Sequence, residues 1–161
     1  MKHNYEKEFV EICIKKKILI NVAESCTGGL ISSKIVSIAN SSKVFKLGLI
    51  TYSNQSKINF LNVPPVILSK YGAVSKETAH HMVNGLALYD KNISFSFAVT
   101  GIAGPGGGTK EKPVGLTFHS FLYKEKNIII EKNIFRGERN SIREKAAEYA
   151  LRRSIDIITY K

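Results

Sequence analysis

The chain has 161 residues, of which 43% are hydrophobic, enough to bury one core but too few for two independent domains. The sequence contains neither an apolar run of about 18 residues nor the apolar core of a signal peptide, so we expect one cytoplasmic domain over residues 1–161 without membrane contact. The formal net charge of +11 favours anionic partners, but it does not choose among nucleic acid, phosphorylated metabolites and acidic surfaces.

The first part of the chain alternates helical and strand patterns. Apolar residues at helical spacing predict a helix over residues 5–16, and the short apolar run 19–22 predicts a strand. The segment 23–29 then turns sharply into a second helix that ends near Ile38, and another strand is expected over 44–51. A strand, a sharp turn and a helix therefore follow one another.

Capping residues mark the next two helices. Ser53 is placed to cap a short helix over 54–61, which carries Lys57 and is interrupted by Pro64 and Pro65. Ser75 precedes an apolar pattern that predicts a longer helix over 76–89.

The second half contains three strand patterns and one helix. A strand over 93–99 runs into the glycine-rich segment 100–108, which is too rich in glycine for a regular element. Strands over 114–123 and 128–135 predict an antiparallel hairpin, and an amphipathic helix over 141–158 closes the chain.

This order of elements predicts an α/β fold. The simplest arrangement is a single three-layer α/β/α domain with a mixed, mainly parallel sheet and a late antiparallel hairpin. In open α/β sheets, ligands bind outside the carboxyl ends of the strands. The segments 23–29 and 100–108 both follow predicted strands, so candidate functional residues are sought there.

Ser25 lies at the predicted junction between a strand and a helix. Free N–H groups of residues 26–29 would point outward there and could stabilise an oxyanion, which suits a nucleophile. The alternative is that Ser25 or Thr27 caps the helix and the glycines permit a tight turn. Cys26 is a rival nucleophile, but no nearby histidine suggests its activation, and a small buried residue is the simpler interpretation.

A serine nucleophile needs a base, and the histidines show no arrangement typical of a triad. His80 and His81 project about 100° apart on a helix, so they are poorly placed to bind one metal ion, and we expect no metal site. A lysine can serve as the base when burial lowers its pKa. Lys57 lies in an otherwise uncharged stretch, although it could equally be an ordinary surface lysine.

The glycine-rich segment matches neither a P-loop nor the GxGxxG motif. Its backbone N–H groups could converge on a phosphate, and Arg136, Arg139 and Arg143 near the start of the last helix could add bidentate contacts. The alternative is a mobile surface loop beside a solvated basic helix.

Five ordered motifs together resemble the CinA carboxy-terminal domain family. They are AESCTGG at 23–29, TYSN at 51–54 with Lys57, YGAVS at 71–75, TGIAGP at 100–105 and KPVG at 112–115. The resemblance runs from about Phe9 to Ile157, almost the whole chain. The family is known for amidohydrolases of nicotinamide nucleotides.

The resemblance implies hydrolysis of nicotinamide mononucleotide to nicotinate mononucleotide and ammonia, as in pyridine nucleotide salvage, without a metal or cofactor. Ser25 matches the nucleophile, Lys57 the base, and Tyr52 a residue that assists catalysis. Arg139 most nearly matches an arginine that holds the phosphate, with Arg143 one helical turn away as the alternative. The expected substrate-binding residues are Thr27, Gly28, Gly29, Thr100, Gly101, Gly104 and Arg139.

Other functions stay open at this point. A non-catalytic nucleotide-binding module, with a regulatory or competence- or repair-linked role, would bind the nucleotide without releasing ammonia. No recognised nucleic-acid motif accompanies the positive charge, so we expect a small-molecule nucleotide as partner and no specific nucleic acid. We also expect a homo-oligomer, most simply a dimer. Some family members carry an additional amino-terminal domain with pyrophosphatase chemistry, and we do not expect that activity here.

Overall fold

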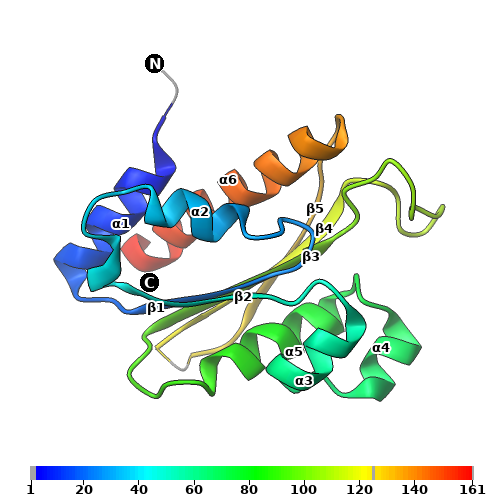
Figure 1. Ribbon diagram of the computed structural model, residues 1–161, viewed down its shortest axis with the longest axis horizontal. Helices are drawn as coiled ribbons and strands as arrows, with labels where there is room; N and C mark the ends of the chain where they lie inside the picture. The colour runs from blue at the N-terminus through cyan, green and yellow to red at the C-terminus, as the bar shows by residue number, and fades with distance from the viewer. Residues whose placement is uncertain (1–2, 125, 161) are drawn as a thin grey trace.

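The computed structural model describes residues 3–124 and 126–160, which form one mixed sheet in the order β2-β1-β3-β4-β5 (Figure 1). The strands are β1 (Ile20–Glu24), β2 (Phe45–Ile50), β3 (Phe95–Gly101), β4 (Leu116–Tyr123) and β5 (Ile129–Ile134). β1 pairs in parallel with β2 and β3, whereas β4 is antiparallel to both β3 and β5. The predicted α/β fold with a mixed sheet and a late hairpin is confirmed.

Helices cover both faces of the sheet, as the three-layer prediction requires. One face carries α1 (Tyr5–Lys16), α2 (Leu30–Val36) and α6 (Arg139–Tyr160), and the other carries α3 (Asn54–Leu61), α4 (Pro65–Tyr71) and α5 (Lys76–Ala87) (Figure 1). A short 3-10 helix, η1 (Ser41–Lys43), precedes β2. Within the described ranges, no helix combines the length and apolar character needed to span a bilayer.

Each face of the sheet has its own hydrophobic core. Phe97 of β3 belongs to the larger cluster, together with Phe9 of α1, and the next residue, Ala98, belongs to the smaller cluster with Met82 of α5. Successive side chains of a strand point to opposite faces, so β3 contributes to both cores. The buried central strands thereby fix the positions of the loops at their carboxyl ends.

The predicted caps form as expected. The Ser53 hydroxyl accepts a hydrogen bond from the Ser56 amide at 3.0 Å, and the Ser75 hydroxyl accepts one from the Thr78 amide at 3.1 Å. The prolines do not end α3, which stops at Leu61 with Asn62 as its left-handed C-cap; Pro65 is instead the first residue of α4. A proline is tolerated there because its missing N–H has no partner in the first turn of a helix. The sequence analysis did not predict α4.

Three element boundaries differ from the predictions in ways that shape the site. β1 continues to Glu24, because this residue still pairs with Ile50 of β2 and Val99 of β3. β3 continues to Gly101, which pairs with Thr117 of β4. α6 begins at Arg139, two residues earlier than predicted.

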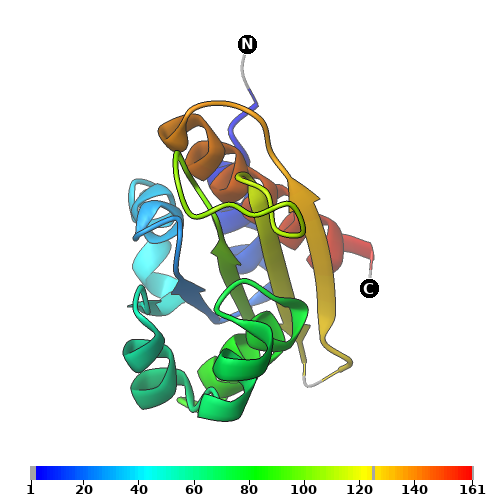
Figure 2. The same ribbon diagram turned by 90° about the vertical axis from the view of Figure 1, so that its right-hand side faces the viewer.

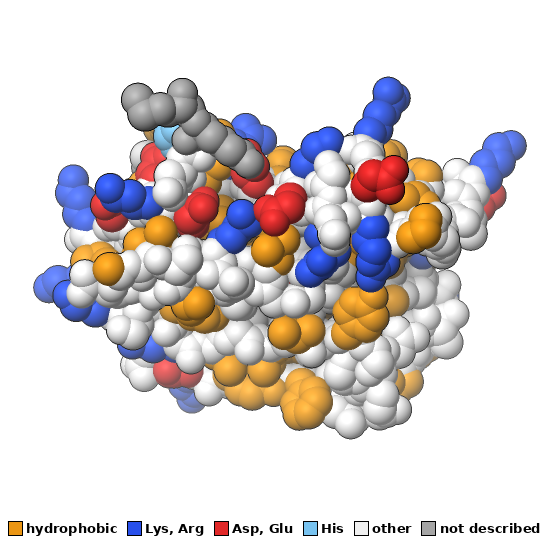
Figure 3. Space-filling view, turned by 45° about the horizontal axis from the view of Figure 1, so that its top comes forward, with side chains coloured by type: hydrophobic (Ala, Val, Ile, Leu, Met, Phe, Trp, Pro, Cys, Tyr) orange, Lys and Arg blue, Asp and Glu red, His pale blue; other side chains and the backbone are white. Residues whose placement is uncertain are grey.

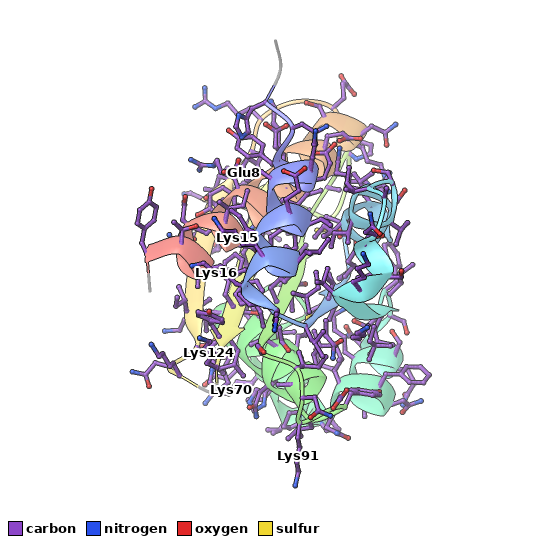
Figure 4. All side chains as sticks on the ribbon, turned by 90° about the vertical axis from the view of Figure 1, so that its left-hand side faces the viewer. Glu8, Lys15, Lys16, Lys70, Lys91 and Lys124 are labelled. Carbon is purple, nitrogen blue, oxygen red and sulfur yellow. The ribbon has the colours of Figure 1, made fainter. Side chains whose placement is uncertain are left out.

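The carboxyl ends of β1, β2 and β3 lie at the same end of the molecule, which faces the viewer in Figure 2. Figure 3 shows positive and negative side chains intermixed over the upper half of another face. Figure 4 views the end opposite to Figure 2, with labelled lysines from several segments: Lys15, Lys16, Lys70, Lys91 and Lys124. The net positive charge therefore comes from many parts of the surface.

Candidate active site

Ser25 is the first residue after β1 and lies between the ends of two neighbouring strands. Its amide donates to the Val99 carbonyl at 3.0 Å, which continues the pairing with β3. On the other side, the Thr51 amide donates to the Glu24 carbonyl at 2.8 Å. Ser25 is consequently anchored on both sides, and only 7% of its surface is exposed.

The turn that follows Ser25 depends on two glycines. Gly28 and Gly29 have φ angles of 59° and 91°, in the left-handed region that glycine adopts without steric cost. The Gly28 amide donates to the Ser25 carbonyl at 3.1 Å and closes the turn. Gly29 is the N-cap residue of α2.

A buried carboxylate occupies the start of α2. Glu24 is fully buried, and its carboxylate accepts hydrogen bonds from the amides of Gly29 at 3.0 Å, Ile31 at 3.1 Å and Ser32 at 2.8 Å. The Ser32 hydroxyl adds a fourth donor at 2.7 Å. These donors compensate for the burial of a negative charge, which is otherwise costly.

The expectation that the amides of 26–29 all point outward is wrong for two of them. The Gly28 amide bonds to the Ser25 carbonyl, and the Gly29 amide bonds to Glu24. Within residues 3–124 and 126–160, the amides of Cys26 and Thr27 donate to no backbone carbonyl, and the Cys26 amide lies near its own side-chain sulfur. These two amides therefore are the ones available to bind an oxyanion.

Lys57 projects from α3 to Ser25 and is fully buried. Its Nζ lies 3.1 Å from Ser25 Oγ, 2.7 Å from the Thr51 carbonyl oxygen and 3.4 Å from the Tyr52 carbonyl oxygen. The alternative interpretation of Lys57 as a surface lysine is therefore wrong. The fold brings together the two residues that the sequence analysis had assigned as nucleophile and base.

Burial lowers the pKa of Lys57 from 10.5 to about 8, because removal from water disfavours the ammonium ion. In the described part of the chain, no carboxylate forms a salt bridge with Lys57 that would oppose this effect. A neutral amine has two N–H groups and one lone pair. When the carbonyls of Thr51 and Tyr52 accept the two N–H groups, the lone pair faces Ser25, as a base requires.

Arg139 spans the site from one side to the other. One guanidinium nitrogen donates to the Gly104 carbonyl at 2.6 Å, and the other donates to the Tyr52 hydroxyl at 3.0 Å. Tyr52 follows β2 and Gly104 follows β3, so this bridge joins segments on either side of the β1 end that carries Ser25. Both Arg139 and Tyr52 are exposed, Tyr52 by 60%. It is the Tyr52 carbonyl, and not its hydroxyl, that contacts Lys57.

Thr100 and Gly101 shape the site from β3. The Thr100 hydroxyl is buried and donates to the Ala73 carbonyl at 2.7 Å, which attaches the 71–75 segment to β3. A Cβ atom on Gly101 would lie 2.6 Å from Thr117 Cγ2 and 3.1 Å from Cys26 Sγ. The glycine therefore allows the turn after Ser25 to pack closely against β3 and β4.

Arg143 contacts the same turn from α6. One guanidinium nitrogen donates to the Thr27 carbonyl at 2.8 Å, and another donates to the Asn140 side chain at 3.2 Å. The Thr27 hydroxyl is buried and has no hydrogen-bond partner among the described residues. Arg136 is exposed, and its carbonyl accepts a hydrogen bond from Lys145 at 2.6 Å.

The rival nucleophile Cys26 and the buried His119 have environments that differ from those of Ser25 and Lys57. Cys26 is buried, and burial raises its pKa to about 12, so the thiol stays protonated near neutral pH. His119 is also buried, and burial lowers its pKa to about 4. No group of three or more potential metal ligands occurs among residues 3–124 and 126–160.

The profile of the CinA C-terminal domain matches residues 2–158. The chain belongs to this family. A CinA-like protein of Kosmotoga olearia is 47% identical over 146 residues, which cover 91% of this chain and 35% of that protein. A CinA-like protein of Thermosipho melanesiensis is 48% identical over 88% of this chain and 36% of its own length. The chain thus spans about a third of the length of these curated relatives.

Solved structures of the CinA family share the fold. The competence/damage inducible protein CihA from Agrobacterium tumefaciens superposes with a TM-score of 0.89 at 36% identity, covering 98% of this chain and 97% of that one. A CinA superfamily protein from Klebsiella pneumoniae gives a TM-score of 0.93 at 22% identity, covering 99% and 100%, a likeness of fold alone.

Two residues of this CinA domain contact the turn over residues 25–29 in a way that the sequence did not predict. Glu24 is fully buried against α2, and Arg143 was considered only as a ligand for phosphate. The burial of Glu24 could have been predicted, because it is an acidic residue at the end of an apolar run and directly before a glycine-rich turn. Nothing in the sequence indicated the contact between Arg143 and Thr27, because 116 residues separate them.

Proposed function

We propose that this CinA domain is an amidohydrolase that converts nicotinamide mononucleotide to nicotinate mononucleotide and ammonia. The observation that carries the proposal is the 3.1 Å contact between Lys57 Nζ and Ser25 Oγ in a buried site. A buried lysine with a pKa of about 8 suits a base that works near neutral pH. The nature of the substrate rests on the resemblance of the five motifs to nicotinamide-nucleotide amidohydrolases.

In the first half of the reaction, Ser25 Oγ attacks the carboxamide carbon and its proton passes to neutral Lys57. The carbonyl oxygen becomes an oxyanion, which the free amides of Cys26 and Thr27 are placed to bind. Collapse of this intermediate breaks the carbon–nitrogen bond. Lys57 returns the proton to the departing nitrogen, so ammonia leaves and an ester of Ser25 remains.

In the second half, water attacks the ester carbon and Lys57 accepts one of its protons. The same two amides bind the second oxyanion, and its collapse releases the nicotinate carboxyl group from Ser25 Oγ, which regains the proton from Lys57. The reaction thus consumes one water molecule and leaves both residues in their starting states.

Arg139 suits the phosphate of the nucleotide. Its guanidinium is exposed at the site, and the Tyr52 hydroxyl that it contacts is also exposed and can be exchanged for phosphate oxygens. Because the phosphate is remote from the bond that breaks, this contact would orient the ring rather than stabilise the oxyanion. The contact of Tyr52 with Arg139 supports a role for the Tyr52 hydroxyl in substrate positioning.

The test is release of ammonia from a panel of pyridine nucleotides, including the mononucleotide, its riboside and nicotinamide. We expect the mononucleotide to be the best substrate, and Ser25→Ala to abolish turnover while retaining fold and nucleotide binding. Wild-type turnover in Ser25→Ala would refute the nucleophile assignment. Binding of nucleotides without any ammonia would instead support a non-catalytic nucleotide-binding module.

A further inference from the structure

Two partly buried contacts flank Gly28 in the turn that follows Ser25, residues 25–29. On one side, the Arg143 guanidinium donates to the Thr27 carbonyl at 2.8 Å. On the other side, the Glu24 carboxylate accepts the Gly29 amide at 3.0 Å. Only Gly28 lies between these two anchors, and a glycine can adopt many backbone conformations. The anchors therefore select one conformation of the turn.

The conformation selected is the one that leaves two amides free beside Ser25. Cys26 and Thr27 are the residues of the turn whose amides donate to no backbone carbonyl within the described ranges. The Ser25 carbonyl, which shares a peptide group with the Cys26 amide, accepts the Gly28 amide at 3.1 Å. A peptide group whose carbonyl already accepts a hydrogen bond is polarised, which makes its N–H group a better donor.

The contacts of Arg143 differ from those of Arg139. Arg139 is exposed at the start of α6 and contacts the exposed Tyr52 hydroxyl. Arg143, one helical turn later, is half-buried, and it contacts the backbone of the turn and the Asn140 side chain. A Cβ atom on Gly28 would lie 3.5 Å from the Arg143 guanidinium, so the arginine packs directly on the turn.

We propose that Arg143 and Glu24 are positioning residues that hold the Cys26 and Thr27 amides in place as the oxyanion donors for attack by Ser25. This inference rests on the proposed function, because it takes Ser25 as the nucleophile. It assigns Arg143 to the acyl-transfer centre and leaves the phosphate to Arg139. Both residues act through the backbone of the turn and need no contact with the substrate.

The test uses an alkyl fluorophosphonate, which reports on Ser25 without any nucleotide. Ser25 Oγ forms a bond to phosphorus, the P–F bond breaks, fluoride leaves and the hydroxyl proton passes to Lys57. The phosphoryl oxygen takes the place of the oxyanion, so the labelling rate depends on the two amides. A misplacement of about 1 Å can cost about 100-fold in rate, so we expect Arg143→Ala to be labelled about 10- to 100-fold more slowly.

Four further measurements separate positioning from general loss of structure. The pH midpoint of labelling should stay where Lys57 sets it, and added guanidinium ion should restore part of the rate in Arg143→Ala. Arg152→Ala is the matched control on α6, because Arg152 is exposed and lies over the Tyr149 ring. This variant should be labelled at the wild-type rate. Circular dichroism checks that each variant is folded.

Two variants extend the test. Arg143→Lys keeps the charge but loses the planar fork, and it should be slowed less than Arg143→Ala. Glu24→Gln replaces one carboxylate oxygen by an NH2 group, which cannot accept the hydrogen bonds that the backbone amides donate to Glu24. If this variant folds, it should be labelled as slowly as Arg143→Ala. Wild-type labelling of folded Arg143→Ala, or a slower rate with a shifted pH midpoint, would overturn the inference. Failure of the wild type itself to be labelled would refute the proposed function, and the inference with it.

Discussion

The burial of Lys57 should be measurable as a pH-dependent stability, independently of any substrate. The folded-state pKa is about 8 and the ordinary value is 10.5. Between these values the unfolded chain binds more protons than the folded chain, so the wild type becomes more stable as the pH rises. One pKa unit is worth about 1.4 kcal/mol, so burial of the ammonium ion costs the folded state about 3 kcal/mol below pH 8.

Lys57→Met removes the titrating group and keeps a side chain of similar length. The variant loses hydrogen bonds to the carbonyls of Thr51 and Tyr52, a cost that does not depend on pH. The difference in unfolding free energy, wild type minus variant, should therefore rise by about 2 to 3 kcal/mol from pH 7 to pH 10. The direction of this change follows from the lowered pKa alone.

Urea unfolding followed by circular dichroism at several pH values measures this difference. The matched control is Lys91→Met, because Lys91 is exposed on a loop at the end of the molecule opposite to Ser25 and Lys57 (Figure 4). Its difference from the wild type should be constant over the same pH range. A difference that is equally flat for Lys57→Met would show that Lys57 keeps its proton as an ordinary lysine does, and would refute its assignment as a neutral base.

Three further predictions concern activity. Below about pH 8, kcat/KM should rise about tenfold per pH unit, because only the neutral form of Lys57 acts as a base. Lys57→Arg should be inactive, because guanidinium keeps its proton. Substantial activity in this variant would mean that Lys57 acts only as a fixed charge. Arg139→Ala should raise KM for the mononucleotide about 10- to 150-fold, with little change for the riboside, in steady-state assays; equal losses on both would exclude a phosphate contact. Gly101→Ala should lower kcat for the mononucleotide and the riboside alike, because the added Cβ would push against Thr117 and Cys26. Gly106→Ala is the control and should leave kcat unchanged, because a Cβ there meets nothing within 4 Å.

Local signals predicted most of the secondary structure. Ser53 and Ser75 cap their helices as the sequence indicates, because an N-cap hydroxyl bonds to an amide only three residues away. The hairpin of β4 and β5 was equally readable, since its two strands are joined by a short polar link. The unpredicted α4 begins at Pro65, because a proline that would interrupt the interior of a helix is accepted in its first turn.

Assignment of the site by sequence depended on the resemblance to the CinA family. From composition and spacing alone, Lys57 could have been a surface lysine, because a lysine among polar residues gives no sign of burial. Its surroundings come from Ser25, Thr51 and Tyr52, which meet the same amine because α3, packed on α5, directs Lys57 toward the ends of β1 and β2. The lowered pKa is a consequence of that packing.

The turn over residues 25–29 shows most clearly what the sequence alone determined. The glycines and the position after a buried strand were enough to predict a sharp turn with exposed amides. Which amides stay free was decided by the fold, because the Gly28 amide bonds within the turn and Glu24 takes the Gly29 amide. Arg143 reaches the Thr27 carbonyl only because α6 packs beside α2. Backbone donors look alike in a sequence, and only their tertiary partners distinguish a structural amide from one left for an oxyanion.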